Sequence, residues 1–313
     1  MLPRRETAWS FAAAFIVMVA FFALAPFMLY PVFLMEVLCF ALFACAFNLL
    51  IGYVGLVSFG HALYFGWASY FAAYAAKSWG WQPEFAVLLG TGAAAVLGAI
   101  AGLVAIRRQG IYFAMITLAL AQMMYLVALR VKMTGGEDGI QAVPRGHLFG
   151  MFNLGNDRAM YVFIVVVVVA AFLLIYRIIN SPFGEVLKAI RENEQRTISL
   201  GYKTDRYKLL AFVLSATLAG LAGSLKALVF QLASLTDVHW NMSGEVVLMT
   251  LVGGLGTVFG PVAGAFIVVA MENYFSAFGQ WVLVIQGAIF VFCVLLFRRG
   301  IVGELANVLR IKL

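Results

Sequence analysis

The polar stretch Ser181-Pro-Phe-Gly-Glu-Val-Leu-Lys-Ala-Ile-Arg-Glu-Asn-Glu-Gln-Arg-Thr-Ile-Ser-Leu-Gly-Tyr-Lys-Thr-Asp-Arg-Tyr-Lys208 interrupts a sequence that otherwise consists of long apolar runs. Ser181 is a suitable N-cap, and Pro182 suits the first helical position, where its missing N–H costs nothing. The stretch therefore predicts a short helix that begins at Ser181 and ends near Gly201. Apolar runs long enough to cross a membrane flank it on both sides.

The predicted helix has an apolar side and a charged side. The apolar side carries Phe183, Val186, Leu187 and Ile190. The charged side carries Glu185, Lys188, Arg191, Glu192 and Gln195. Residues three or four apart share one face of a helix, so this helix is amphipathic. Such a helix either lies on a lipid surface or docks into a groove on another protein.

Composition indicates a membrane protein. Of the 313 residues, 64% are hydrophobic and only 11% are charged, whereas about a quarter of a soluble domain is charged. The net charge of +7 is concentrated at a few loops, which indicates membrane topology rather than nucleic-acid binding. We expect a multi-pass protein of the cell inner (plasma) membrane, in contact with lipid and with one transmembrane domain over residues 1–313.

Membrane spans follow from the rule that a helix needs about 20 apolar residues to cross the hydrocarbon core. The expected spans are 9–30, 33–51, 61–76, 85–106, 111–129, 159–176, 209–232, a broken region at 245–275, and 281–297. The predicted fold class is therefore all-α. It is a polytopic membrane helical bundle with roughly 8 to 10 spans, broken or re-entrant helices included.

Positive charges predict the orientation, because Lys and Arg in short loops stay on the cytoplasmic side. Arg4 and Arg5 place the N-terminus in the cytoplasm, and alternation then places segment 181–208 there as well. One continuous span over 245–275 would leave the arginines at 298–299 outside, against the rule. We therefore expect this region to enter and return to the same face, with the C-terminus cytoplasmic.

Two glycine-rich breaks interrupt the apolar helices. The first is Gly52-Tyr-Val-Gly-Leu-Val-Ser-Phe-Gly-His61, and the second is Gly253-Gly-Leu-Gly-Thr-Val-Phe-Gly-Pro261. Glycine and proline at this density end helices, and backbone freed at membrane depth must face protein or a water-filled cavity. Paired breaks in the two halves of a chain are typical of transporters with an inverted internal repeat. We expect such a repeat in this chain.

Polar residues and glycines at or facing these breaks are the candidates for a translocation pathway. The predicted pathway residues are Ser58, His61, Thr117, Gly254 and Gly256. Ser58 and His61 stand out, because backbone groups at a helix break are free to meet a solute. The alternative for each polar residue is hydrogen bonding between helices, which we expect for Asn48 and Ser215.

No residue pattern indicates catalysis. The three histidines are far apart, the three cysteines lie inside apolar runs, and the sequence lacks a phosphate-binding Walker run. The ionisable residues nearest the membrane interior are Glu36, Lys226, Glu245 and Glu272. We expect the three glutamates at an interface and Lys226 to snorkel, so none indicates ion coupling. The sequence predicts no enzyme activity, no cofactor and no metal site, and an energy source outside this chain.

Six stretches resemble the LivM-type membrane subunits of ABC importers for branched-chain amino acids. They are the two breaks, Gly110-Ile-Tyr-Phe-Ala-Met-Ile-Thr-Leu-Ala119, Thr134-Gly-Gly-Glu-Asp-Gly139, the segment 181–194 and Ser215-Ala-Thr-Leu-Ala-Gly-Leu-Ala-Gly223. Their order and spacing carry the resemblance, which covers most of the chain after the first span. The sequence departs from the family at Thr197-Ile-Ser199, where small alanine-rich residues are more usual.

The resemblance implies the permease of an ATP-driven importer. Its partners would be a second, homologous permease subunit in a heterodimer, two cytoplasmic ABC ATPase subunits and an extracytoplasmic solute-binding protein. Coupling to the ATPase would involve segment 181–208, at Phe183, Glu185, Val186, Leu187, Ile190, Arg191 and Glu192. The apolar side would enter a groove on the ATPase, and the charges would set the register. The alternatives are an ion- or proton-coupled secondary transporter or channel, and an ABC permease for urea or amides.

Overall fold

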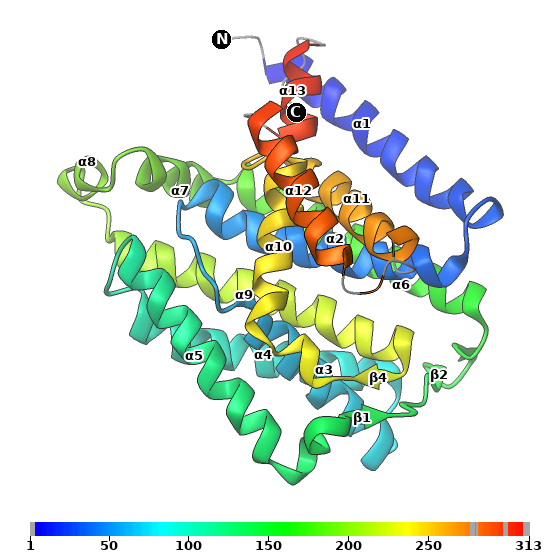
Figure 1. Cartoon of the computed structure of the whole chain (residues 1–313). Helices are drawn as coiled ribbons and strands as arrows, with labels where there is room; N and C mark the ends of the chain where they lie inside the picture. The colour runs from blue at the N-terminus through cyan, green and yellow to red at the C-terminus, as the bar shows by residue number, and fades with distance from the viewer. Residues whose placement is uncertain (1–3, 276–278, 280, 297–299, 309–313) are drawn as a thin grey trace.

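The computed structural model of this protein describes residues 4–275, 279, 281–296 and 300–308 and is mostly helical (Figure 1). The long helices are α1 (Arg4–Leu24), α2 (Pro31–Tyr53), α3 (His61–Ser78), α4 (Pro83–Ala105), α5 (Ile111–Arg130), α6 (Asp157–Ile179) and α9 (Thr204–Phe230). The shorter ones are α7 (Pro182–Glu192), α8 (Glu194–Ser199), α10 (Trp240–Gly253), α11 (Gly260–Phe275), α12 (Trp281–Leu296) and α13 (Gly300–Val308). Arg298 and Arg299, on which the orientation argument depends, lie outside the described residues.

Short turns and strands complete the described chain. Four 3-10 turns are η1 (Ala25–Phe27), η2 (Lys132–Thr134), η3 (Gly136–Asp138) and η4 (Leu235–Asp237). The strands are β1 (Ile140–Gln141), β2 (His147–Leu148), β3 (Phe152–Asn153) and β4 (Leu232–Ala233). β1 pairs antiparallel with β4, with Ile140 opposite Ala233, and β2 pairs antiparallel with β3. These two small sheets lie in connections between helices and leave the all-α architecture intact.

The expected polytopic helical bundle is confirmed. By length and composition, α2, α4, α5, α6 and α9 are the five described helices that can each cross a membrane. α2 runs through the middle of the bundle (Figure 1), and almost every residue from Leu34 to Leu50 is buried. In contrast, α4, α5 and α6 expose large apolar side chains such as Leu88, Met115 and Val166. Apolar side chains on the outside of a bundle are what a lipid environment favours.

Helices α3, α4 and α9 pack closely through small residues. A Cβ added at Gly90 would lie 2.5 Å from the carbonyl oxygen of Ala68, and one at Gly223 would lie 1.9 Å from that of Phe65. Only glycine lets two helix backbones approach this closely. Close packing is therefore the role of these glycines. A Cβ at Gly92, in contrast, would meet nothing within 4 Å.

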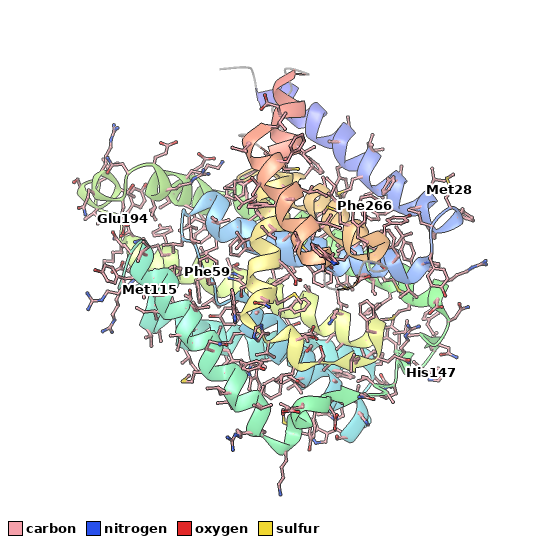
Figure 2. All side chains as sticks on the ribbon, viewed as in Figure 1. Met28, Phe59, Met115, His147, Glu194 and Phe266 are labelled. Carbon is pink, nitrogen blue, oxygen red and sulfur yellow. The ribbon has the colours of Figure 1, made fainter. Side chains whose placement is uncertain are left out.

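Polar segments gather at two opposite ends of the bundle. We name them the α7 end, which holds α7, α8 and the turn 106–110, and the strand end, which holds β1–β4. At the α7 end Gln109 donates a hydrogen bond to Glu194 at 3.0 Å, and at the strand end Arg145 and Asp157 form an ion pair at 2.6 Å. Figure 2 shows Glu194 and His147, from the two ends, on opposite sides of the molecule.

The second break forms a helical hairpin, which is the shape that the charge argument requires, while the membrane face to which the hairpin returns stays a prediction. α10 has 14 residues and α11 has 16, fewer than the number that spans a membrane. The turn 254–259 joins them, and a Cβ at Gly264 would lie 1.8 Å from the carbonyl oxygen of Met249, so the two half-helices pack tightly. Both outer ends point to the strand end, where Asn273 donates to Glu36 near the start of α2. The inverted repeat stays a prediction.

Two local expectations were wrong. The polar segment is not one helix, because Asn193 adopts φ −158° and its side chain caps α8 by accepting from the N–H of Arg196 at 3.0 Å. The ammonium group of Lys226 does not reach out to solvent. It forms an ion pair with Asp237, which is 0% exposed. For the Lys226 ammonium group, the buried Asp237 carboxylate close by is a stronger partner than water at a distance.

Candidate functional site

The polar segment begins as its sequence predicts. The N–H of Gly184 donates to the Ser181 hydroxyl at 3.3 Å, and Pro182 occupies the first turn of α7. A Cβ added at Gly184 would lie 2.1 Å from the carbonyl oxygen of Ile179, the last residue of α6. Helix α7 is therefore anchored directly on the end of α6.

The apolar side of α7 packs inward, against its own chain. Leu187 is 0% exposed and Ile190 is 4% exposed, while Val186 is half-buried. Phe183 stacks on Tyr207 of α9, with ring centroids 5.7 Å apart. α2, α6 and α9 all contact α7.

This packing corrects one part of the coupling hypothesis. Leu187 and Ile190 cannot enter a groove on another protein in this conformation, because their own chain already covers them. Hydrophobic periodicity shows which face of a helix is buried, but it does not show which partner buries it. Leu187 and Ile190 therefore hold α7 on the bundle, whereas the coupling role of the half-buried Phe183 and Val186 stays a prediction.

The exposed residues of the polar segment agree only in part with the predicted coupling residues. Glu185, Ala189 and Glu192 are exposed on α7, and Lys188 pairs with Glu185 at 2.9 Å. Beyond Asn193, three apolar side chains are also exposed: Ile198 by 45%, Leu200 by 70% and Tyr202 by 44%. We name these six exposed residues the docking surface. Its apolar part was missed because a single helix to Gly201 was assumed.

Helix α8 is held in place by an ion pair. Glu194, its first residue, binds the ammonium group of Lys208, which is 2% exposed and lies on α9. The hydroxyl of Thr204 donates to the same carboxylate at 3.2 Å. A charge this well paired is not available for a partner, so Glu194 and Lys208 position α8 rather than form its surface.

The first break is an extended segment between α2 and α3, and its freed backbone groups are satisfied by two predicted pathway residues. The Ser58 hydroxyl accepts from the N–H of Gly60 at 3.2 Å. Thr117 of α5 accepts from the N–H of Phe59 at 3.2 Å and is 1% exposed. Ser58 and Thr117 are therefore brought together around one stretch of backbone, which fits the hydrogen-bonding interpretation.

His61 begins α3 and joins it to α9 and α2. Its Nε2 lies 2.8 Å from the Ser215 hydroxyl, which donates its own proton to the carbonyl oxygen of Ala46 at 2.5 Å. Ser215 must then accept a hydrogen bond from Nε2–H. Within the described residues Nδ1 has no hydrogen-bond partner. His61 is 0% exposed, so no solute reaches it in this conformation.

The second break is fixed by an asparagine of α2. Asn48 donates to the carbonyl oxygen of Thr257 at 2.8 Å and accepts from the N–H of Gly256 at 3.0 Å. Gly254 and Gly256 have φ of +124° and +74°, which favour glycine. These two predicted pathway residues therefore supply backbone shape, and Asn48 holds that shape through both ends of its amide.

The two breaks meet at one place, although they lie far apart in the sequence. A Cβ added at Gly52 would lie 2.9 Å from the nitrogen of Gly256. Arg191, assigned from the sequence to the rim of an ATPase contact, is exposed on α7 and also donates to the carbonyl oxygen of Gly52. We name Asn48, Gly52, Gly55, Arg191, Gly256 and Thr257 the break cluster. It connects the polar segment with both breaks.

A bundle of apolar helices with two contacting breaks and one long polar segment is the architecture that the sequence resemblance implied. Residues 29–294 match the family described as branched-chain amino acid transport system / permease component. The chain belongs to this family. It is therefore a transmembrane permease component, which is a non-catalytic subunit.

Individual relatives agree with this assignment. The permease protein LivM of the high-affinity branched-chain amino acid transport system of Escherichia coli (strain K12) is 26% identical over 293 residues, which cover 85% of this chain and 68% of that protein. LivM of Salmonella typhimurium is 25% identical with the same coverage. The ribose import permease protein RbsC of Bacillus subtilis (strain 168) is 28% identical and covers 58% of each chain. No solved structure matches the chain.

Proposed function

We propose that this chain is the permease subunit of an ATP-driven importer for branched-chain amino acids, and that separate ATPase subunits drive it through the α7 end. In this proposal it pairs with a homologous permease in a heterodimer, and an extracytoplasmic solute-binding protein delivers the substrate. The α7 end then faces the cytoplasm, with both termini on that side.

The observation that carries the proposal is the docking surface together with its mechanical support. Ile198, Leu200 and Tyr202 place exposed apolar side chains beside the charged side of α7. A mixed surface of this kind suits a protein partner, because apolar groups supply affinity and charges set the register. The support is rigid, since Glu194 and Lys208 fix α8 and Gly184 packs on the end of α6. Force applied to this surface therefore reaches the bundle.

These contacts support alternating access as the transport mechanism of the proposal. Closure of the ATPase pair would shift α7 and α8 against the bundle, and α6 and α9 would move with them because they flank the segment. The break cluster lies directly under α7, so the same shift changes the two breaks on which the pathway depends. Binding energy at one site thereby selects between two conformations of the bundle.

The substrate class rests on the extent of similarity. The LivM relatives match 85% of this chain, whereas the ribose permease matches 58%. We therefore place branched-chain amino acids before sugars, and before urea or amides. An ion- or proton-coupled transporter is less consistent with the structure. Among the described residues, the buried acidic and basic side chains Lys208 and Asp237 are both bound in ion pairs, Lys208 with Glu194 and Asp237 with Lys226.

Reconstitution tests the proposal. The chain is purified with its sister permease, the two ATPases and the binding protein, and placed in proteoliposomes. Uptake of radiolabelled leucine, ribose and urea is measured with ATP, and with ion or proton gradients alone. We expect leucine uptake that requires ATP and the binding protein and is reduced by isoleucine and valine. Uptake by the chain alone under a gradient would instead identify a secondary transporter, and ATP-driven uptake of ribose or urea without leucine would correct the substrate.

A further inference from the structure

Arg191 caps the helix that leads into the first break. The N–H groups of Val54, Gly55 and Leu56 all donate to the carbonyl oxygen of Leu50. Arg191, in the last turn of α7, donates through Nη1 to the carbonyl oxygen of Gly52 in the last turn of α2. Carbonyl groups at the end of a helix lack intrahelical partners, and the negative end of the helix dipole attracts a cation. Arg191 supplies both the donor and the charge.

The same side chain fills the space between the two breaks. A Cβ added at Gly55, where φ is +82°, would lie 3.2 Å from Arg191 Cγ. One added at Gly256, where φ is +74°, would lie 3.2 Å from Arg191 Nη1. Both glycines adopt left-handed backbone conformations, so each can change conformation more readily than another residue. Arg191 therefore lies against a conformationally permissive glycine in each break.

Two further contacts close the cluster. Asn48 bonds Gly256 and Thr257, so the second break is tied to α2 as well as to Arg191. A Cβ at Gly300, the first residue of α13, would lie 2.3 Å from Cα of Gly254. Elements from the first half, the middle and the end of the chain thus meet at one point under α7. A movement of α7 therefore also displaces these contacts, because close-packed protein interiors transmit strain.

We propose that Arg191 is the positioning residue that transmits movement of α7 to both glycine breaks. The proposal rests on the proposed function, because it needs an ATPase that moves α7. Displacement of α7 withdraws the guanidinium from the Gly52 carbonyl and from the gap between Gly55 and Gly256. Both breaks then become free to change backbone conformation, and access to the pathway changes with them. Arg191 acts between the docking surface and the pathway.

The experiment measures conformational coupling rather than binding. Leu255, which is 37% exposed, lies in the second break and is replaced by Cys as a reporter. The background carries Cys293→Ala, while Cys39 and Cys45 are buried and stay. The full complex is reconstituted in nanodiscs. The rate of labelling of the reporter by fluorescein maleimide is measured before and after the ATPases are trapped with ATP and vanadate.

We expect trapping to change the labelling rate several-fold in the parent chain. In Arg191→Gln we expect normal assembly and ATP hydrolysis, but no change of the labelling rate on trapping and loss of leucine uptake. The matched control is Arg196→Gln, on the exposed surface of α8, which should respond like the parent. A parent-like response and parent-like uptake in Arg191→Gln would overturn the proposal.

A second variant covers the case in which Arg191→Gln does not assemble. Arg191→Lys keeps a cation at the end of α2, but its shorter side chain and single ammonium group cannot also fill the gap at Gly256. A reduced labelling response in Arg191→Lys supports the role of Arg191, and a full response overturns it. If the parent chain does not bind the ATPases at all, the proposed function is refuted, and the role of Arg191 with it.

Discussion

Replacement of Asn48 is expected to destabilise the protein strongly, because this side chain holds the second break with both ends of its amide. Asn48 donates to Thr257 at 2.8 Å and accepts from Gly256 at 3.0 Å, and it is 3% exposed. In Asn48→Ala both backbone groups lose their partner. In Asn48→Asp the carboxylate still accepts from Gly256, but it cannot donate to Thr257 and it brings a negative charge next to that carbonyl oxygen.

The magnitude follows from the two hydrogen bonds. Interhelical hydrogen bonds in membrane proteins contribute about 0.6 kcal/mol on average and up to about 1.7 kcal/mol, so two contribute about 1–3 kcal/mol. The upper part of this range applies here, because the bonded groups belong to non-helical backbone that has no alternative partner at this depth. We therefore expect Asn48→Ala to lower the free energy of unfolding by about 3 kcal/mol, and Asn48→Asp by at least as much.

Unfolding in mixed micelles, titrated with sodium dodecyl sulfate and followed by tryptophan fluorescence, measures this free energy. The matched control is Asn180→Ala, because Asn180 is exposed and its amide donates only to Tyr176, one turn back, at 2.9 Å. We expect the control to change the free energy of unfolding by less than about 0.5 kcal/mol. Asn48→Ala with a control-sized effect, or Asn48→Asp as stable as the parent, would refute the reasoning.

Three more predictions concern the ion pair at the strand end, the small-residue packing and the docking surface. Asp237→Ala should lower the free energy of unfolding by about 3–5 kcal/mol, because it leaves the Lys226 ammonium group unpaired. The double variant Asp237→Ala, Lys226→Met should recover much of that loss in the same titration. Gly223→Ala should prevent the native packing of α9 on α3, whereas Gly92→Ala should be neutral or stabilising by up to about 1 kcal/mol, compared by monodispersity in size-exclusion chromatography. Leu200→Ser should weaken binding of the ATPases in pull-down assays without lowering the thermal midpoint, and equal binding would argue against the docking surface.

The helices and the two breaks were predictable from the sequence because they depend on local composition. Apolar runs of span length gave α2, α4, α5, α6 and α9. Dense glycine and proline gave the hairpin between α10 and α11, since the backbone at those residues does not favour a continuous helix. Charge counting supported the same hairpin independently. Each of these signals is complete within a few residues of sequence.

Contacts between distant segments were not predictable in the same way. Amphipathicity identified the buried side of α7 correctly, but Leu187 and Ile190 are buried by their own chain rather than by a partner. Asn193 was not recognised as the N-cap of α8, although Asn is a favoured residue at that position. Arg191 carried no local signal of its contact with Gly52, because a hydrogen bond to a backbone carbonyl depends on the fold and not on the neighbouring residues.

The central claim is that ATPase subunits bind this permease at the α7 end, and one cross-linking measurement tests it most directly. A photoreactive benzoylphenylalanine is placed at Ala189, which is exposed on α7, and at Met151, which is 77% exposed at the strand end. Each variant is expressed with the ATPases and irradiated in native membranes. The account predicts an ATPase adduct from position 189 and none from position 151. An adduct from position 151 without one from 189 would contradict it.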